Sequence, residues 1–295
     1  MSRGPQTSGF FQKMQNHIRT HSSYRDPSIS GWDDIAACYH DVIVGPFLPE
    51  MIVKDERGLC RNKLLNRLWE KGVHLKSLRI GDFGCGPGNL IPHLSGLVNH
   101  LTLLDYSPKS LTKACDMAAG YGMNITPIET DLRTYVSKTS FDLILSVNAL
   151  QPPKRSDVVS ILKNMRDSLA PGGEIFLNIP SFEALSHLIQ YFVMDRANLY
   201  GIEKARKIGK EFEERTGYDP ITCSSFFPHI QARQCLHSRE TLEHEISLAG
   251  LKFKSPLQKV AYPRSVVKQR WDIDYPEMEE YWNWFCVLEK NERDK

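Results

Sequence analysis

Between about residues 78 and 180, short apolar runs alternate with stretches whose apolar residues recur every three to four positions. The first pattern is typical of strands buried on both faces, and the second of helices that cover a sheet with one apolar side. Their alternation predicts βαβ units and a parallel sheet. We expect strands at 78–83, 101–105, 124–128, 141–147 and 174–179, and helices at 89–97, 109–120 and 156–169.

The segments on both sides complete the predicted fold. Residues 33–44 and 57–72 have helical spacing and predict an N-terminal cap, and residues 181–235 predict two helices and a loop that form a lid. Ser238 is expected to cap a helix that ends at Ala249-Gly250, before two alternating strands at 251–260 and 282–289. The fold class is therefore α/β: a seven-stranded, mostly parallel, doubly wound sheet with helices on both faces. We divide the chain into a cap (1–75), a core (76–180), a lid inserted after the fifth strand (181–235) and a C-terminal completion of the sheet (236–295).

Composition excludes some classes of partner. The 295 residues are 41% hydrophobic and 24% charged with a formal charge of +2, so there is no chain-wide basic field of the kind that binds phosphate backbones. The first 25 residues differ, because Arg3, Lys13, Arg19 and Arg25 occur there without an acidic residue. This basic arm is interpreted either as a solvated leader or as an anion-binding segment.

Cysteine usage and hydropathy indicate a cytoplasmic protein. The seven cysteines form no C-x-x-C pair and no zinc-ligand spacing, so we expect reduced, structural thiols. His17 and His21 are four residues apart but lack an acidic third ligand, so no metal site is expected. No signal-like or membrane-length apolar run is present.

The strongest local motif is the sequence DFGCGPGN at residues 82–89, placed between the first predicted strand and the next helix. Glycines let the backbone approach a ligand closely, although such a turn also serves as a tight connection without a ligand. The dinucleotide fingerprint requires glycine where Asn89 stands, and the P-loop requires a Gly-Lys-Ser/Thr ending that is missing. Asp82 instead places a carboxylate beside the turn, which repels phosphates and tolerates an ammonium or a sulfonium.

Two more acids follow the next two strands. Asp105 ends the second strand, where a carboxylate can accept hydrogen bonds from both ribose hydroxyls, and Asp131 follows the third, where it can accept one from an adenine amino group. A single acid of this kind is commonly a helix cap, but a row of three at successive strand ends favours a ligand site.

With these motifs, the strand and loop FDLILSVNAL at 141–150 and LAPGG at 169–173, the chain resembles the class I S-adenosylmethionine-dependent methyltransferases. The resemblance implies that Asp82 and the glycine turn hold the methionine part of the cofactor, Asp105 the ribose, and Asp131 with Leu132 the adenine. It also implies that Trp32 and Tyr39 close over the cofactor. The expected cofactor-binding residues are Tyr39, Asp82, Gly84, Cys85, Gly86, Gly88, Asn89, Asp105, Tyr106, Ser107, Asp131, Leu132, Ser146 and Val147.

The acceptor is expected to be a small molecule. Nucleic-acid amine methyltransferases often carry Asn or Asp-Pro-Pro-Tyr after the fourth strand, whereas here Pro152-Pro153 come three residues late and lack the aromatic residue. The aromatic residues of the lid favour an apolar or aromatic acceptor as much as they favour packing of the lid itself. His229 is the candidate general base. Candidate acceptor contacts are Tyr24, Trp32, Gln151, Tyr191, Phe226 and Phe227.

Three alternatives stay open at this point. One is a nucleic-acid or protein methyltransferase that uses the basic arm, and another is a silent cofactor-binding partner subunit. The third, a nicotinamide dehydrogenase, is disfavoured by Asn89. The methyl group is expected to go to an oxygen, nitrogen or carbon atom of the acceptor.

Overall fold

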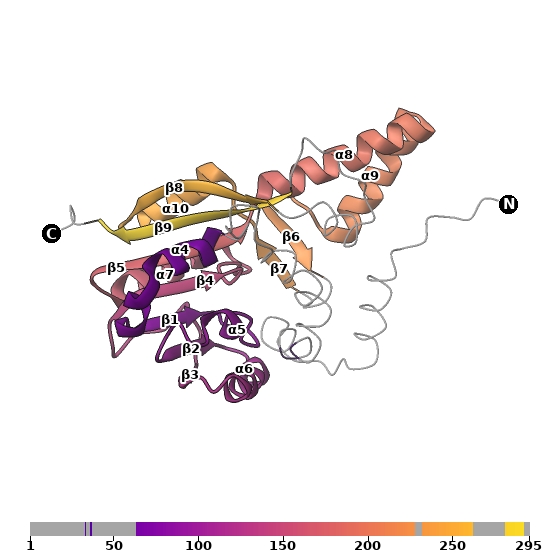
Figure 1. The fold of residues 1–295 in the computed structure, drawn as a ribbon. Coiled ribbons are helices and arrows are strands. Elements are labelled where there is room, and N and C mark those ends of the chain that lie inside the picture. The colour runs from indigo at the N-terminus through magenta and orange to yellow at the C-terminus, as the bar shows by residue number, and fades with distance from the viewer. Residues whose placement is uncertain (1–32, 34–35, 37–62, 228–231, 262–280, 292–295) are drawn as a thin grey trace.

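The computed structural model describes residues 33, 36, 63–227, 232–261 and 281–291. Within these residues, seven strands form one sheet in the order β3-β2-β1-β4-β5-β9-β8 (Figure 1). All neighbours are parallel except β9, which runs antiparallel to both β5 and β8. The strands are β1 Ile80–Phe83, β2 Leu101–Asp105, β3 Ile125–Glu129, β4 Phe141–Val147, β5 Leu169–Pro180, β8 Leu251–Ala261 and β9 Trp282–Lys290. The predicted doubly wound sheet is confirmed.

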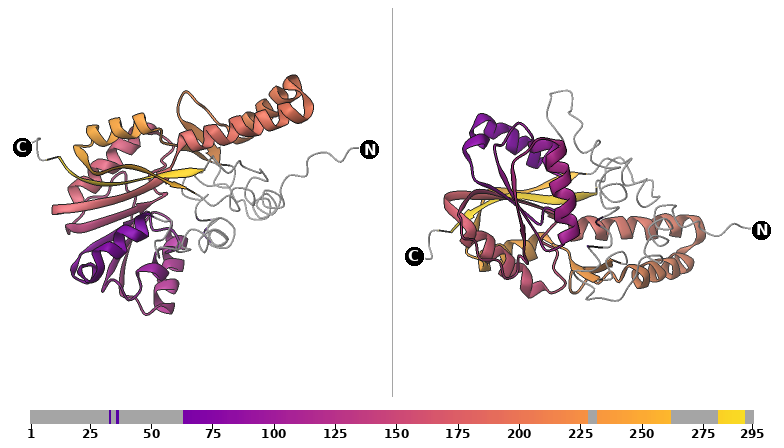
Figure 2. Two further views of the ribbon diagram at one scale, coloured as in Figure 1. Left: turned by 45° about the horizontal axis from the view of Figure 1, so that its top comes forward. Right: turned by 90° about the horizontal axis from the view of Figure 1, so that it is seen from below.

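Helices cover both faces of the sheet, and each face has its own apolar cluster (Figure 2). On one face, α7 and α10 pack over β4, β5 and β9 through residues such as Leu162 and Ile246. On the other, α4, η2, α5 and α6 pack over β1 and β2 through residues such as Leu68 and Ala114. The elements are α4 Lys63–Lys71, η2 Gly72–Ser77, α5 Ile91–Leu94, α6 Pro108–Gly120, α7 Arg155–Ser168 and α10 Arg239–Leu248.

The insertion after β5 departs in part from the prediction. Two helices, α8 (Phe182–Tyr200) and α9 (Ile202–Thr216), form a hairpin that projects from the sheet (Figure 1). The expected loop contains a two-stranded antiparallel ribbon of β6 (Ser224–Phe227) and β7 (Ala232–Cys235). Four-residue strands are too short to show a periodicity, and Pro228 beside them signals a loop, so the pattern concealed the ribbon.

Two other elements differ in length from the prediction. The helix expected at 89–97 is the short α5, because Gly96 has a φ of +76° that ends the helix. Strand β5 starts five residues early, since its Pro-Gly-Gly segment is accommodated by a register shift against β4 between Phe141 and Leu143. Of the two expected N-terminal helices, 57–72 corresponds to α4 where it is described, and only Asp33 and Ala36 of the other are described, both helical.

The parallel register brings the carboxyl ends of the strands to one edge. Asp82 of β1 pairs with Leu103 of β2 and with Leu145 of β4. The turns that follow β1, β2 and β4 therefore meet. Within the described residues, no helix is long and apolar enough to cross a membrane.

Candidate functional site

The glycine turn after β1 is fixed by its backbone. The amides of Gly84 and Cys85 donate to the carbonyl of Leu104 at 2.7 and 3.0 Å, which joins the turn to the end of β2. Gly84 has a φ of +79°, and a Cβ there would lie 2.2 Å from the Cβ of Ala149. Gly88 has a φ of +87°, and its Cβ would lie 3.1 Å from the backbone of Ala114 on α6. Both positions therefore require glycine, and the turn lies directly against the loop after β4.

Asp105 holds the turn from the end of β2. Its two oxygens accept the amides of Gly86 and Ser107, each at 2.9 Å, and the residue is 8% exposed. Burial raises the pKa of this carboxyl, while the backbone hydrogen bonds oppose the rise. Asp105 thus links the turns after β1 and β2 at the position predicted to face the ribose.

Asp82 is a buried carboxylate with an unsatisfied oxygen. It is 2% exposed, and its Oδ2 has no hydrogen-bond partner in the part of the chain that the structure describes. Burial, and secondly the charge of Asp105, raise the pKa of Asp82 to about 7. A buried acid without a partner is costly, so a cationic group that reaches this oxygen is held strongly.

Other predicted residues gather around the same turn. Asn89 Oδ1 and Ser146 Oγ are also buried and unpartnered among the described residues. A Cβ on Gly84 would lie 3.9 Å from Leu132 Cδ1, so the loop after β3 reaches the glycine turn. The structure therefore brings together the predicted residues of the first four strand ends: Asp82, Gly84, Cys85, Gly86, Gly88, Asn89, Asp105, Tyr106, Ser107, Asp131, Leu132, Ser146 and Val147.

Two of these predicted residues are already engaged. Asp131 accepts three hydrogen bonds from the guanidinium of Arg133 and one from its backbone amide, and although burial opposes it, these bonds lower the pKa of Asp131. The hydroxyl of Ser107 caps α6 by accepting the amide of Ser110 at 3.1 Å, and it donates to Asp33 at 2.5 Å. Asp33 therefore lies at this edge of the sheet, a contact that no local sequence pattern indicates.

The side next to β5 and β9 carries three asparagines that were not among the predicted site residues. Asn148 follows β4 with a φ of +55°, and its Oδ1 accepts a hydrogen bond from Asn283 Nδ2 at 2.8 Å. Asn178 of β5 pairs with Val147, and its Oδ1 is buried without a partner among the described residues. Asn148 has a positive φ, which is uncommon for a residue other than glycine, and its contacts with Asn178 and Asn283 hold it in this conformation.

The predicted acceptor contacts that the structure describes are spread over three elements and do not gather at the glycine turn. Gln151 lies in the loop after β4, Tyr191 on α8, and Phe226 and Phe227 on β6. Phe226 packs against Gly217 at the end of α9, which is a contact inside the insertion. Tyr24, Trp32, Tyr39 and His229 lie outside the described residues.

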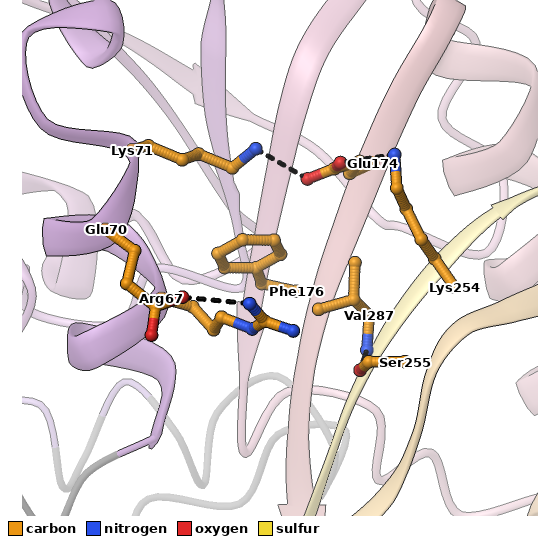
Figure 3. Close-up of a pocket in the computed structure, with 8 residues that line it drawn as sticks. All are labelled: Arg67, Glu70, Lys71, Glu174, Phe176, Lys254, Ser255 and Val287. Atoms are coloured by element: carbon orange, nitrogen blue, oxygen red, sulfur yellow. Dashed lines mark hydrogen bonds and ion pairs between the residues drawn. The ribbon is translucent and has the colours of Figure 1, made fainter.

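A separate cavity of about 270 Å³ lies between α4 and strands β5, β8 and β9 (Figure 3). Lys71 and Lys254 reach Glu174 from two sides, at 2.7 and 2.8 Å. Glu174 pairs with Leu143 in the first half of β4, far along the strands from their carboxyl ends. Because Lys71 and Lys254 already pair with Glu174, we interpret the charged residues that line this cavity as a structural ion-pair cluster.

The sheet order, the glycine turn and the acids at the strand ends together define the class I, Rossmann-like methyltransferase fold. Residues 80–173 match the family described as "Methyltransferase domain". The CcbJ methyltransferase from Streptomyces caelestis superposes with a TM-score of 0.53 at 13% identity, covering 90% of this chain and 99% of that one. The DhpI-SAH complex has a TM-score of 0.53 at 14% identity, covering 90% and 97%. At such identities the likeness establishes the fold.

Curated relatives match a shorter stretch of sequence. The trans-aconitate 2-methyltransferase of Streptomyces avermitilis is 37% identical over 116 residues, which are 37% of this chain and 42% of that relative. The enzyme of the same name from Mycobacterium tuberculosis (strain ATCC 25177 / H37Ra) is 36% identical over 118 residues, 38% and 41% of the two chains. The match thus spans about two fifths of these relatives' length.

Proposed function

We propose that this protein is an S-adenosylmethionine-dependent methyltransferase that acts on a small molecule. The observation that carries the proposal is the Oδ2 of Asp82, which is buried beside the glycine turn and has no hydrogen-bond partner among the described residues. S-adenosylmethionine fits a site with this carboxylate, because it presents an ammonium and a sulfonium, whereas a phosphate would be repelled. Complexes of DhpI, a protein of the same fold, with SAH and with SAM support the choice.

The residues divide among the parts of the cofactor. Asp82 and the glycine turn would hold the methionine part, with Asn89 and Ser146 as further polar contacts. Asp105 is proposed to accept from the ribose hydroxyls, and Asp131 with Leu132 to contact the adenine. Since Arg133 donates four hydrogen bonds to the carboxylate of Asp131, adenine contact at this position requires that the pair rearrange or share the carboxylate.

The cofactor supplies an activated methyl group, so the protein's main task is to align the acceptor and to exclude water. The loop after β4 begins at Asn148, which is held by Asn283, and meets the glycine turn at Ala149, so Asn148 is proposed to orient the acceptor. A hydroxyl or ammonium acceptor also needs a base to remove its proton, and His229 remains the candidate.

The acceptor class rests on the relatives and on the insertion. Because the relatives are named for trans-aconitate, a small carboxylic acid is the first acceptor to test. Apolar or aromatic molecules come second, on the strength of the aromatic residues of the insertion. We place the enzyme in the cytoplasm, since the five cysteines that the structure describes are free thiols.

The test is transfer of a labelled methyl group. The purified protein is incubated with methyl-labelled S-adenosylmethionine and either trans-aconitate or size-fractionated metabolites. The proposal expects label in a low-molecular-weight product, and loss of that label in Asp105→Ala. Label found only in protein or nucleic acid would contradict the small-molecule assignment, and no transfer despite cofactor binding would favour a silent partner subunit.

A further inference from the structure

Behind the loop that follows β4 lies a buried, charged cluster that the proposed function leaves unused. His237 is 0% exposed and sits between β7 and α10. Its Nε2 lies 2.6 Å from the carbonyl oxygen of Leu150, and its Nδ1 lies 3.2 Å from Glu245 Oε2. Arg155 at the start of α7 holds the other oxygen of Glu245 at 2.6 Å. The cluster therefore joins α7, α10 and the end of the insertion to the loop after β4.

The groups that face the two ring nitrogens are both hydrogen-bond acceptors. A carbonyl oxygen only accepts, so the proton of the first contact belongs to Nε2. Burial alone would raise the pKa of Glu245, but the hydrogen bonds and charges of His237 and Arg155 lower it, so this side chain is a carboxylate and also accepts. Both ring nitrogens of His237 thus face acceptors, so the ring is held between the loop after β4 and α10.

This contact leads in two residues to the glycine turn. Leu150 is 0% exposed. Its neighbour Ala149 packs so closely on Gly84 that a Cβ added to Gly84 would lie only 2.2 Å from the Cβ of Ala149. The same loop is held once more from the insertion, because the amide of Cys235 donates to the carbonyl of Pro152 at 3.1 Å. A shift of the Leu150 carbonyl by a few tenths of an ångström is therefore transmitted to Gly84, since close-packed contacts have no slack.

We propose that His237 is a positioning residue for the cofactor site: by holding the Leu150 carbonyl it fixes Ala149 against Gly84 and so sets the affinity of the glycine turn for the cofactor. The inference rests on the proposed function and extends it to a residue that touches neither cofactor nor acceptor. It also connects the insertion to the cofactor site, because His237 is anchored at the end of β5 through Phe182, whose amide donates to the His237 carbonyl at 3.0 Å.

Two substitutions separate the two contacts of the ring. The amide nitrogen of glutamine reaches about as far as Nε2 and can keep the bond to Leu150, whereas that of asparagine reaches as far as Nδ1 and can keep the bond to Glu245. We expect His237→Asn to weaken S-adenosylhomocysteine binding about tenfold and His237→Gln to stay within about threefold of wild type, the scale of one net hydrogen bond. Thermal stability should rank in the opposite order, because His237→Gln deprives the buried Glu245 of a partner.

The measurement is isothermal titration with S-adenosylhomocysteine well below the melting temperature of each variant, with hydrogen exchange on the peptide spanning residues 148–155. The proposal expects faster exchange of this peptide in His237→Asn and near-wild-type exchange in His237→Gln. Affinities that follow the melting temperatures in both variants would reduce His237 to a structural role and overturn the proposal.

A measurement on the wild-type protein covers the case in which His237→Asn does not fold. Coupling is reciprocal, so S-adenosylhomocysteine should slow exchange around residues 235–238 as well as in the glycine turn. Protection confined to the glycine turn would contradict the proposal. A wild-type protein that binds no S-adenosylhomocysteine would remove the proposed function, while the exchange of residues 148–155 in the two variants would still decide whether His237 holds the loop.

Discussion

The two halves of the sheet's carboxyl edge are built in different ways. On the β1 and β2 side, the contacts are made mostly by backbone groups of residues close in sequence, such as the amide of Gly86 and Asp105, 19 residues apart. On the β5 and β9 side, side chains make them across long separations, such as Arg155 to Glu245 over 90 residues and Asn283 to Asn148 over 135. The first half is a turn that requires glycine at fixed positions, whereas the second is a network of individual side-chain hydrogen bonds.

This difference predicts where substitutions matter. At a tightly packed glycine of a backbone turn, an added side chain has no room, so the substitution causes a steric clash and a large loss of stability. In a side-chain network each substitution removes one or two hydrogen bonds, so the loss of stability or affinity is smaller for each substitution. The following substitutions, from the largest expected effect to the smallest, test this contrast.

Gly84→Ala should have the largest effect. The new Cβ would lie 2.2 Å from Ala149 at a φ of +79°, so the turn or the loop after β4 must move. Overpacking and strain together are expected to lower the free energy of unfolding by about 3 kcal/mol and to abolish measurable cofactor binding. Gly72→Ala is the control, since Gly72 has a φ of +53° but nothing within 4 Å of its Cβ. Equal losses in denaturant unfolding of the two variants would show that contact with Ala149 is unimportant.

Asp105→Ala should weaken S-adenosylmethionine binding by about 1.5 to 3 kcal/mol, the scale of hydrogen bonds to a charged group. The variant loses the acceptor of the Gly86 and Ser107 amides as well as the proposed ribose contact. Asp116→Ala, an exposed acid on α6, serves as the control in the same titration. Unchanged affinity in Asp105→Ala would remove the ribose assignment.

Asp82→Asn should stabilise the ligand-free protein while it weakens cofactor binding. The folded pKa of about 7 lies above the unfolded value of 3.8, so the folded state binds an extra proton between them. The stability of the wild type therefore falls as pH rises through this window, and the uncharged variant avoids that loss. Melting temperatures measured from pH 4 to 8 should give a difference in favour of Asn that grows up to about pH 7 and then levels off. A constant difference would mean that the carboxyl titrates normally.

Arg133→Ala should have the smallest effect. Its pair with Asp131 is exposed, with side chains 41% and 35% accessible, so the loss of unfolding free energy should stay below about 1 kcal/mol. Cofactor affinity should be unchanged or slightly improved, because Asp131 becomes available to the adenine. A large loss of affinity would indicate that Arg133 itself contacts the ligand.

The same contrast explains which elements and residues could be predicted from the sequence. The core strands were predicted within a residue or two, except β5, whose start was missed because its Pro-Gly-Gly segment is absorbed in a bulge. The glycine turn and the acids were found because each lies in a short motif at a strand end. Asn178 and His237 were missed because only the folded chain brings them to the site, and the β6 and β7 ribbon because four residues show no period.

The most direct test of the central claim is calorimetric titration of the wild-type protein with S-adenosylhomocysteine in buffers of different ionisation enthalpy. If Asp82 is the anchor for the ligand's ammonium, binding occurs at one site per chain, releases a proton near pH 6, and tightens as pH rises toward about 7, where the free carboxyl ionises. Absence of binding, or binding with no proton release near pH 6, would contradict the account.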